Sequence, residues 1–241
     1  QWAVSANIGT YKTELTDLPS NVINKYAGDG VHDLILGRSP NSAYGLVADG
    51  IFKTQEEVDA HADQPGKAVG RIRYKDLDGD GVINETYDRT WIGCYDPDFF
   101  GGLNFDFAYK GFDLNLFFEG MFGNDVNSDW KKESDIWLFT NPAWKNHATR
   151  MLGGWSPDNP NSDIPAISNN TANQEQRFSS WFIEDGSYIK LRNIELGYTF
   201  PTKLIKKMHM SNLRLYAAAY NVFTLKKFWG DDKYTSFDPE R

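Results

Sequence analysis

Cysteine is almost absent from this sequence of 241 residues, which holds Cys94 alone. One thiol excludes an internal disulfide framework and a zinc centre built on several cysteines. The four histidines are His32, His61, His147 and His209, and they show no HExxH or similar metal-site spacing. GxSxG, P-loop and GxGxxG motifs are also missing. We therefore expect no enzymatic activity.

Long apolar runs and basic stripes are missing as well. No stretch approaches the roughly 18 apolar residues of a membrane helix. The chain opens on Gln1-Trp2-Ala3-Val4, which does not resemble a signal peptide. The net charge is −8, so we do not expect nucleic acid as a partner. Aromatic residues, in contrast, make up 15% of the chain, which is high for a soluble domain.

Apolar residues recur with a period of two around Lys110-Gly111. Residues 103–109 alternate apolar with small or polar side chains, and the alternation resumes over 112–118. Two alternating strands joined by a two-residue turn that ends in glycine predict a β-hairpin. Its register places Tyr109 opposite Phe112 on the apolar face.

Three more strands follow from the same periodicity. Residues 189–200 alternate with a slip of phase near Asn193, which predicts a bulge. Pro201 ends that strand, a short basic segment makes a turn or one helical turn, and residues 213–223 return. Residues 2–9 also alternate. The sequence thus predicts an all-β protein with about five antiparallel strands, each near the ten residues of a membrane-barrel strand.

The connections between these strands alternate in length. The connections at 110–111 and 201–212 are short, whereas the segments 13–98, 122–180 and 226 onward are long. Outer-membrane barrels have this asymmetry of short periplasmic turns and long outer loops. A soluble antiparallel β protein is the alternative, because alternation cannot tell which face meets lipid. Five strands are fewer than the roughly eight that close a barrel, so we expect part of a wall.

The run DLDGDGVIN, residues 76–84, has the spacing of a calcium loop. Asp76, Asp78 and Asp80 fall at positions 1, 3 and 5, and Gly81 falls at the bend. The predicted ligands are the side chains or carbonyls of Asp76, Asp78, Asp80, Val82, Asn84 and Asp88. Tyr87 occupies position 12, where an EF-hand carries a bidentate Glu, and Asp88 comes one residue later.

A structural Ca²⁺ within residues 76–88 is therefore our expectation. The alternative is a metal-free turn, since Asp and Gly both favour turns. A loop of about 85 residues between two strands is expected to have little core of its own. A bound ion would replace part of that missing packing.

Six segments in order resemble one protein family, the SusC/RagA TonB-dependent transporters. The resemblance covers residues 2 to 239 and matches the C-terminal third of the family. The segments are AYGLVADGIFKTQEEVDAH, GRIRYKDLDGDGVINETYDRTWIG, YKGFDLNLFFEGMFGND, GGWSPDNPNSDIP, SYIKLRNIELGYTFP and LRLYAAAYNVFTL. Similar loops in the family carry Asp at the twelfth position, so the loop here is one residue longer.

The resemblance implies a transmembrane β-barrel of about 22 strands in the outer membrane of a Gram-negative bacterium. It further implies a plug domain, a SusD-like surface lipoprotein as lid, and energy delivered by TonB. The implied cargo is oligosaccharide or peptide, and the outer wall contacts lipid. The plug, the TonB box and the final strands have no counterpart in residues 1–241, so this chain would be the C-terminal portion of the barrel, with extracellular loops 13–98 and 122–180.

Tryptophans in the second long segment are candidates for stacking on sugars. We predict Trp144 and Trp155 as contacts with cargo or a partner, against the alternative that they pack within the loop. Asp113, Asn115 and Glu119 would line the barrel lumen. Two rival classes stay open at this point, a soluble calcium-stabilised β protein that binds or hydrolyses glycans and a dockerin-like module. A dockerin needs two calcium repeats, and the sequence has one.

Overall fold

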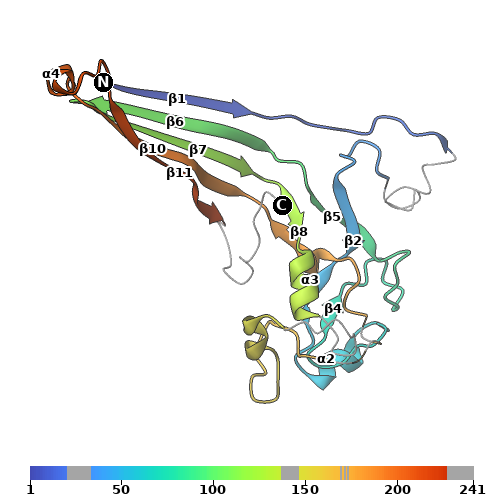
Figure 1. Ribbon diagram of the computed structural model, residues 1–241. Coiled ribbons are helices and arrows are strands. Elements are labelled where there is room, and N and C mark those ends of the chain that lie inside the picture. Colours follow the sequence, from blue (N-terminus) through green and yellow to red (C-terminus); the bar gives the residue numbers. More distant parts are fainter. Residues whose placement is uncertain (21–33, 137–146, 169, 171, 173, 227–241) are drawn as a thin grey trace.

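The computed structural model describes residues 1–20, 34–136, 147–168, 170, 172 and 174–226. Five long strands form one antiparallel sheet in the order β1-β6-β7-β10-β11 (Figure 1). Their bounds are Trp2–Gly9, Phe99–Tyr109, Phe112–Phe122, Tyr188–Thr199 and Arg214–Lys226, in that order. The predicted antiparallel all-β fold with about five long strands is confirmed.

The predicted hairpin joins β6 to β7 through Lys110 and Gly111. Its register pairs Tyr109 with Phe112 and Leu103 with Phe118, as the alternation predicted. Both turn residues have positive φ, 48° for Lys110 and 88° for Gly111. Such a turn matches the right-handed twist of the flanking strands, which explains why a two-residue connection suffices here.

The predicted bulge lies at Arg192 in β10. The register against β7 passes from Leu191–Phe118 to Asn193–Phe117, so Arg192 is the extra residue. Against β11 the pairing passes from Leu191–Phe223 to Asn193–Tyr220, a second irregularity that the periodicity did not indicate. Asn221 has a φ of 52° there and its side-chain oxygen accepts a hydrogen bond from Arg192 at 3.1 Å.

The register divides the sheet into an apolar face and a polar face. The apolar face carries Trp2, Val4, Ile8, Leu103, Phe105, Phe107, Tyr109, Phe112, Leu114, Leu116, Phe118, Leu191, Ile194, Leu196, Tyr198, Leu215 and Phe223, together with smaller residues. The polar face carries Asn7, Asn104, Asp106, Asp113, Asn115, Glu119, Asn193, Glu195 and Arg214, and the aromatic residues Phe117, Tyr216 and Tyr220 also lie on it. Alternation, interrupted at the bulge, therefore gives one face without charged residues and one face that holds the charged and amide side chains.

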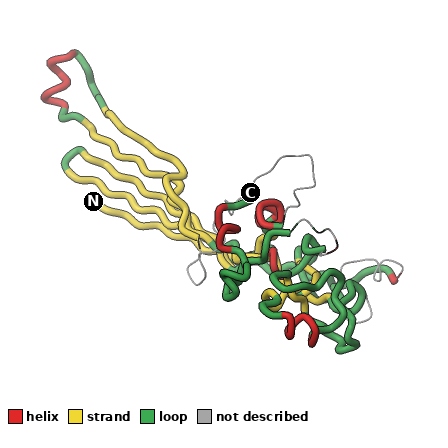
Figure 2. Tube along the Cα trace, turned by 90° about the horizontal axis from the view of Figure 1, so that it is seen from below, coloured by secondary structure: helices red, strands yellow, loops and turns green. Residues whose placement is uncertain are grey.

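Both long connections leave the same end of the sheet and fold together there (Figures 1 and 2). Short strand pairs and short helices make up this loop domain. The pairs are β2 (Ser42–Leu46) with β5 (Arg89–Cys94), β3 (Ala48–Ile51) with β4 (Ile72–Tyr74), and β8 (Asp125–Asn127) with β9 (Ile183–Asp185). The helices are α2 (Gln55–Ala60), α3 (Asp129–Asp135), η1 (Thr149–Gly153) and η3 (Ser180–Phe182).

The loop domain has a hydrophobic core, which corrects the expectation that the first long loop has little core of its own. The buried cluster consists of Leu46, Ile51, Ile72, Tyr74, Ile83, Ile136 and Phe182, drawn from both loops. Burial raises the pKa of Tyr74 to about 12. Most of these residues come from the first loop itself, and the second loop, which lies beyond two strands in the sequence, supplies Ile136 and Phe182.

Polar contacts join the same two loops. The buried Arg71 guanidinium lies 2.7 Å from the Glu175 carboxylate, whose other oxygen accepts the Ile72 N–H at 2.9 Å. Burial is the main cause that raises the pKa of Glu175, partly opposed by Arg71. Leu46 of the first loop donates its N–H to the carbonyl of Phe178 in the second loop at 3.1 Å. The two loops therefore fold as one unit.

The loop bounds differ slightly from those predicted, because β1 ends at Gly9 and β10 begins at Tyr188. The loops thus run over 10–98 and 123–187. Residues 227–241 lie outside the described part of the chain. Within the described ranges, every helix is too short and too polar to pass through a bilayer.

We predict that Ile72→Ala loosens the loop domain, because Ile72 is fully buried in the shared core. Such truncations cost about 2–5 kcal/mol. The rate of limited proteolysis within residues 34–98 of the full-length protein should rise by at least about tenfold. The control Leu152→Ala removes a side chain that is 89% exposed and should leave the rate unchanged. Equal rates for both variants would contradict the shared core.

Candidate functional site

The apolar face of the sheet is exposed to its surroundings. Trp2, Ile8 and Tyr109 are 74%, 77% and 70% exposed, and Leu215 is 60% exposed. The register places no charged residue on this face in any of the five strands. An apolar surface of this extent normally marks contact with a membrane or another apolar surface.

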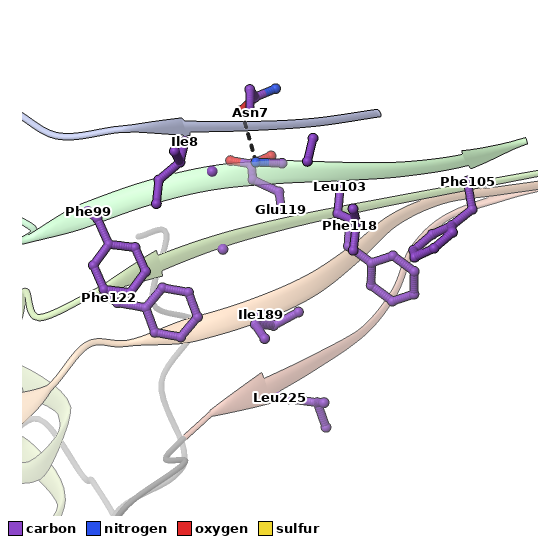
Figure 3. Close-up of a pocket in the computed structure, with 14 residues that line it drawn as sticks. Asn7, Ile8, Phe99, Leu103, Phe105, Phe118, Glu119, Phe122, Ile189 and Leu225 are labelled. Atoms are coloured by element: carbon purple, nitrogen blue, oxygen red, sulfur yellow. Dashed lines mark hydrogen bonds between the residues drawn. The ribbon is translucent and has the colours of Figure 1, made fainter. Parts of the chain in front are cut away.

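A hollow of about 580 Å³ lies on this apolar face, toward the loop domain (Figure 3). Gly101 and Gly120 pair across β6 and β7 at its centre. A side chain at Gly101 would begin 2.5 Å from the carbonyl oxygen of Asn7, so the close approach of β1 requires glycine there. Its rim is formed by Ile8, Phe99, Leu103, Phe105, Phe118, Phe122, Ile189 and Leu225.

The polar face carries a hydrogen-bonded network of side chains across three strands. The Asn115 amide donates to Asn104 at 2.9 Å and to Asp106 at 2.7 Å, and it accepts from Asn193 at 3.0 Å. Local sequence reasoning did not find this network, because only the register places Asn104 and Asn193 beside Asn115. Asp113, Asn115 and Glu119 were predicted to line the lumen together. The register places all three on the polar face.

Two arginines form three ion pairs on the polar face. Arg192, the bulged residue, holds Glu119 at 2.7 Å. Arg214 pairs with Asp113 and, at 2.6 Å, with Glu195. The carboxylates of Asp113, Glu119 and Glu195 are paired with arginines, and Asp106 accepts hydrogen bonds from two asparagine amides, so the polar face can line an aqueous space without large excess charge.

The predicted calcium loop brings three carboxylates together. One oxygen each of Asp76, Asp78 and Asp80 lies within 4.8 Å of the others. Backbone N–H groups orient them: Gly79 and Gly81 donate to Asp76 at 2.7 and 2.9 Å, and Val82 donates to Asp80 at 2.7 Å. The Gly81 hydrogen bond is the main cause that lowers the pKa of Asp76.

Two further predicted ligands lie close by. The Val82 carbonyl accepts the Asn84 amide at 3.4 Å, and the Asn84 side-chain oxygen accepts two N–H groups, those of Thr86 and Tyr87. Gly81 has a φ of 85°, which suits glycine at the bend. The loop is anchored to the core, because Ile83 is buried and its N–H donates to the Asp63 carbonyl at 2.9 Å.

Asp88 plays a different part from the other three aspartates. Its carboxylate is fully buried and accepts the N–H of Leu77 at 2.8 Å and of Asn84 at 2.7 Å. It therefore fastens both ends of the loop to each other. Asp88 does not belong to the converging group of three carboxylates.

The oxygen-rich donor set fits a hard cation. Calcium takes six to eight oxygen ligands, and three carboxylates with a nearby carbonyl and amide oxygen supply part of such a shell. The convergence of three negative charges costs energy unless a cation lies between them. The arrangement thus suits Ca²⁺ with water completing its shell.

Of the two tryptophans predicted to contact cargo or a partner, the structure describes Trp155. Trp144 lies outside the described residues. Trp155 packs against the loop core, and a side chain at Gly70 would begin 2.8 Å from its ring. Its role in cargo or partner contact stays a prediction, and its position fits the alternative that the ring packs within the loop.

No protein-family profile matches the chain. Among curated proteins, it is 31% identical to TonB-dependent receptor P3 of Formosa agariphila over 98% of the chain and 23% of that protein. It is 25% identical to the TonB-dependent receptor SusC of Bacteroides thetaiotaomicron over 96% of the chain and 22% of that protein. The chain therefore spans about a quarter of the length of these relatives.

Solved structures show the same fold. The chain aligns over 99% of its length with a chain of the RagAB peptide transporter, of which it covers 25%, at a TM-score of 0.71 and 24% identity. The open-open state of the RagAB peptide importer aligns with a TM-score of 0.69 and 23% identity, over 24% of that chain. At these identities the alignments establish the arrangement of the strands and loops.

Proposed function

The chain belongs to the TonB-dependent receptors of the SusC/RagA type, and we propose that it forms part of an outer-membrane barrel that imports nutrients. The exposed, uncharged apolar face of the five-stranded sheet is the observation that carries this proposal. In a membrane this face contacts hydrocarbon, and the polar face with its ion pairs lines the lumen.

The open edges of the sheet support a partial wall. Within the described residues, β1 pairs with β6 alone and β11 pairs with β10 alone. Unpaired backbone groups are very costly in hydrocarbon, so strands of the full-length receptor would pair with both edges. The two short turns lie at one end of the sheet and the loop domain at the other (Figure 1). Because outer-membrane barrels have short periplasmic turns and long outer loops, this arrangement supports our proposal that the turns lie in the periplasm and the loops outside the cell.

The names of the relatives support a proposal about partners and cargo. One aligned structure is named as a peptide transporter, and another relative is SusC. We infer that the full-length receptor works with a SusD-like surface lipoprotein, is driven through TonB, and imports oligosaccharide or peptide. The folded loop domain at the outer end offers a rigid surface for such a lid.

The rival soluble β protein fits the molecule less well. A soluble domain buries its large apolar faces against other layers, yet Trp2, Ile8 and Leu215 are mostly exposed. The curated relatives are named receptors rather than glycan hydrolases. A dockerin-like module is also disfavoured, since the described calcium loop lies between short strands.

We predict that lysine is destabilising at one position of β1 and nearly neutral at the next. Val4 lies on the apolar face opposite Phe105, and Ser5 lies on the polar face opposite Asn104. In the full-length receptor, Val4→Lys should lower the free energy of unfolding by about 2–4 kcal/mol, because it places a charge in hydrocarbon. Ser5→Lys should be nearly neutral.

The readout is the fraction of receptor that migrates as the folded, heat-modifiable species after urea titration in liposomes. Equal losses for Val4→Lys and Ser5→Lys would contradict the assignment of the apolar face to lipid. Tolerance of lysine at both positions would do so as well.

We also propose that the loop over residues 76–88 binds one structural Ca²⁺. Asp76, Asp78 and Asp80 are the proposed carboxylate ligands, and the Val82 carbonyl and Asn84 oxygen complete the protein's share. Asp88 was also predicted as a ligand, and its two backbone hydrogen bonds favour a bracing role. A bound ion would stabilise the loop and, through Ile83, the shared core.

Calcium titration of the full-length receptor tests this site. We expect a Kd of about 0.1–1 mM, the range of extracellular calcium modules. Asp78→Asn should weaken binding by about tenfold or more, since it removes a charged ligand. The control Asp158→Asn changes an exposed carboxylate elsewhere and should have no effect.

Proteolysis gives an independent readout. Ca²⁺ should slow cleavage within residues 76–88 of the wild-type receptor and not of Asp78→Asn. Asp88→Asn should speed cleavage with or without Ca²⁺, because the two backbone N–H groups bind different carboxylate oxygens and the amide replaces one of these with an NH2 donor. Cleavage of the wild-type loop at the same rate in calcium and in chelator would overturn the calcium proposal.

A further inference from the structure

The two short turns at one end of the sheet have a charge opposite to that of the whole chain. The β6–β7 turn contains Lys110, and residues 201–212 contain Lys203, Lys206 and Lys207. Neither turn contains an aspartate or glutamate, although the chain carries a net charge of −8. We call residues 201–212 together with Lys110 the basic turn surface.

Residues 201–212 form a compact knob at this end of the sheet (Figure 1). It consists of α4 (Thr202–Ile205) and η4 (Lys206–Met208). Ile205 is buried and its carbonyl accepts the Met210 N–H at 3.2 Å, which closes the knob. His209 adopts the left-handed conformation at its end, with a φ of 59°. The knob therefore presents its other side chains on a defined scaffold.

The lysines of the knob are available to an outside partner. Lys203, Lys206 and Lys207 are exposed, and none of them forms an ion pair within the described part of the chain. The carboxylates of Asp113 and Glu195, in the strands of the sheet, are held by Arg214. Three cationic side chains without an internal partner form a local positive potential that attracts anions.

Apolar side chains stand among these cations. Leu204 and Met208 are each 59% exposed, although both lie on the same knob as the lysines. Tyr198, near the end of β10, and Phe200, just after it, lead into the knob, and their ring centres lie 4.9 Å apart. Tyr198 also contacts Phe112 at 4.6 Å on the apolar face. The basic turn surface is thus continuous with the membrane-facing side of the sheet.

The second turn repeats this combination. The Lys110 ammonium lies 5.1 Å from the ring centre of Tyr109, which is 70% exposed. Trp2, at the same end of β1, is 74% exposed. Tyr and Trp concentrate where a membrane protein crosses from hydrocarbon to headgroups, and lysines reach from there to the headgroups.

We propose that the basic turn surface binds the headgroups of anionic phospholipids in the membrane leaflet on the side of the short turns. This inference rests on the proposed barrel function. Leu204 and Met208 enter the boundary of the acyl chains, and Lys110, Lys203, Lys206 and Lys207 contact the phosphates and negative headgroups. Charge complementarity and continuity with the apolar face favour lipid over a water-soluble partner. Binding of a water-soluble partner would not explain the exposed apolar side chains that lie next to the membrane-facing side of the sheet.

Native mass spectrometry of the full-length receptor tests this proposal. The receptor is released from micelles that contain equal amounts of phosphatidylglycerol and phosphatidylethanolamine, and the bound lipids are counted. Wild-type receptor should prefer phosphatidylglycerol by about fivefold or more, since each lysine near an anionic surface adds to the attraction. The variant with Lys203, Lys206 and Lys207 all changed to Gln should bind the two lipids nearly equally.

Two matched variants control for charge and folding. Changing the same three lysines to Arg keeps the charge and should keep the preference. Changing Lys12, Lys53 and Lys75 to Gln removes three charges from the loop end and should also keep it. An unchanged preference in the first Gln variant, or no preference in the wild type, would overturn the proposal.

Other outcomes separate this proposal from the barrel itself. A receptor that binds neither lipid and shows no heat-modifiable folded form would contradict the proposed barrel function. A receptor that folds normally but binds both lipids equally would contradict the basic turn surface alone. Salt screens such attractions, so the preference for phosphatidylglycerol should weaken at about 0.5 M salt. A preference that stays unchanged at that salt concentration would also contradict the proposed role of the basic turn surface. If binding of a soluble periplasmic protein required the three lysines while the lipid preference stayed unchanged, the basic turn surface would be a protein-binding site and not a lipid-binding site.

Discussion

Pairing of backbone N–H and C=O groups is the constraint on which the rest of this structure depends. A chain that meets hydrocarbon on one side has no water there to satisfy these groups, so neighbouring strands must satisfy them. The three inner strands, β6, β7 and β10, do this on both sides along most of their lengths, and β6 and β7 pair from Phe99–Phe122 to Tyr109–Phe112, whereas β1 and β11 pair on one side within the described residues. Side chains then alternate automatically, which gives the sheet one apolar and one polar face. The irregularity at Arg192 is compatible with this arrangement, because its side chain ion-pairs with Glu119 of the polar face.

The loop domain follows a different physical rule from the sheet. It lies beyond the end of the strands and folds around a buried cluster to which both long connections contribute, for example Ile72 from the first and Phe182 from the second. The Arg71–Glu175 pair and the Leu46–Phe178 hydrogen bond join the same two segments. The loop domain is therefore one folded body beyond the end of the sheet. A calcium ion in the loop around Asp76 would reinforce that body, since Ile83 connects the loop to the core.

Sequence reasoning predicted the elements whose signals are local. The hairpin at Lys110-Gly111 and the bulge after Leu191 were predicted because alternation and turn residues lie within a few positions of each other. The shared loop core was not predicted, because its residues are separated by whole strands. The bracing role of Asp88 was also missed, since nothing in the pattern of a calcium loop distinguishes a carboxylate that binds an ion from one that accepts two backbone N–H groups. The irregularity at Asn221 likewise appears only when β11 pairs with β10.

The most direct measurement of the central claim is the accessibility of spin labels along β7 of the full-length receptor in liposomes. Single cysteines at Leu114, Asn115, Leu116 and Glu119, in a Cys94→Ser background, report both faces of one strand. We expect collisions with lipid-dissolved oxygen to peak at positions 114 and 116, and collisions with a water-soluble nickel chelate to peak at 115 and 119. Low accessibility to both reagents at 114 and 116 would mean that these side chains lie in a dry protein interior, and it would contradict the account.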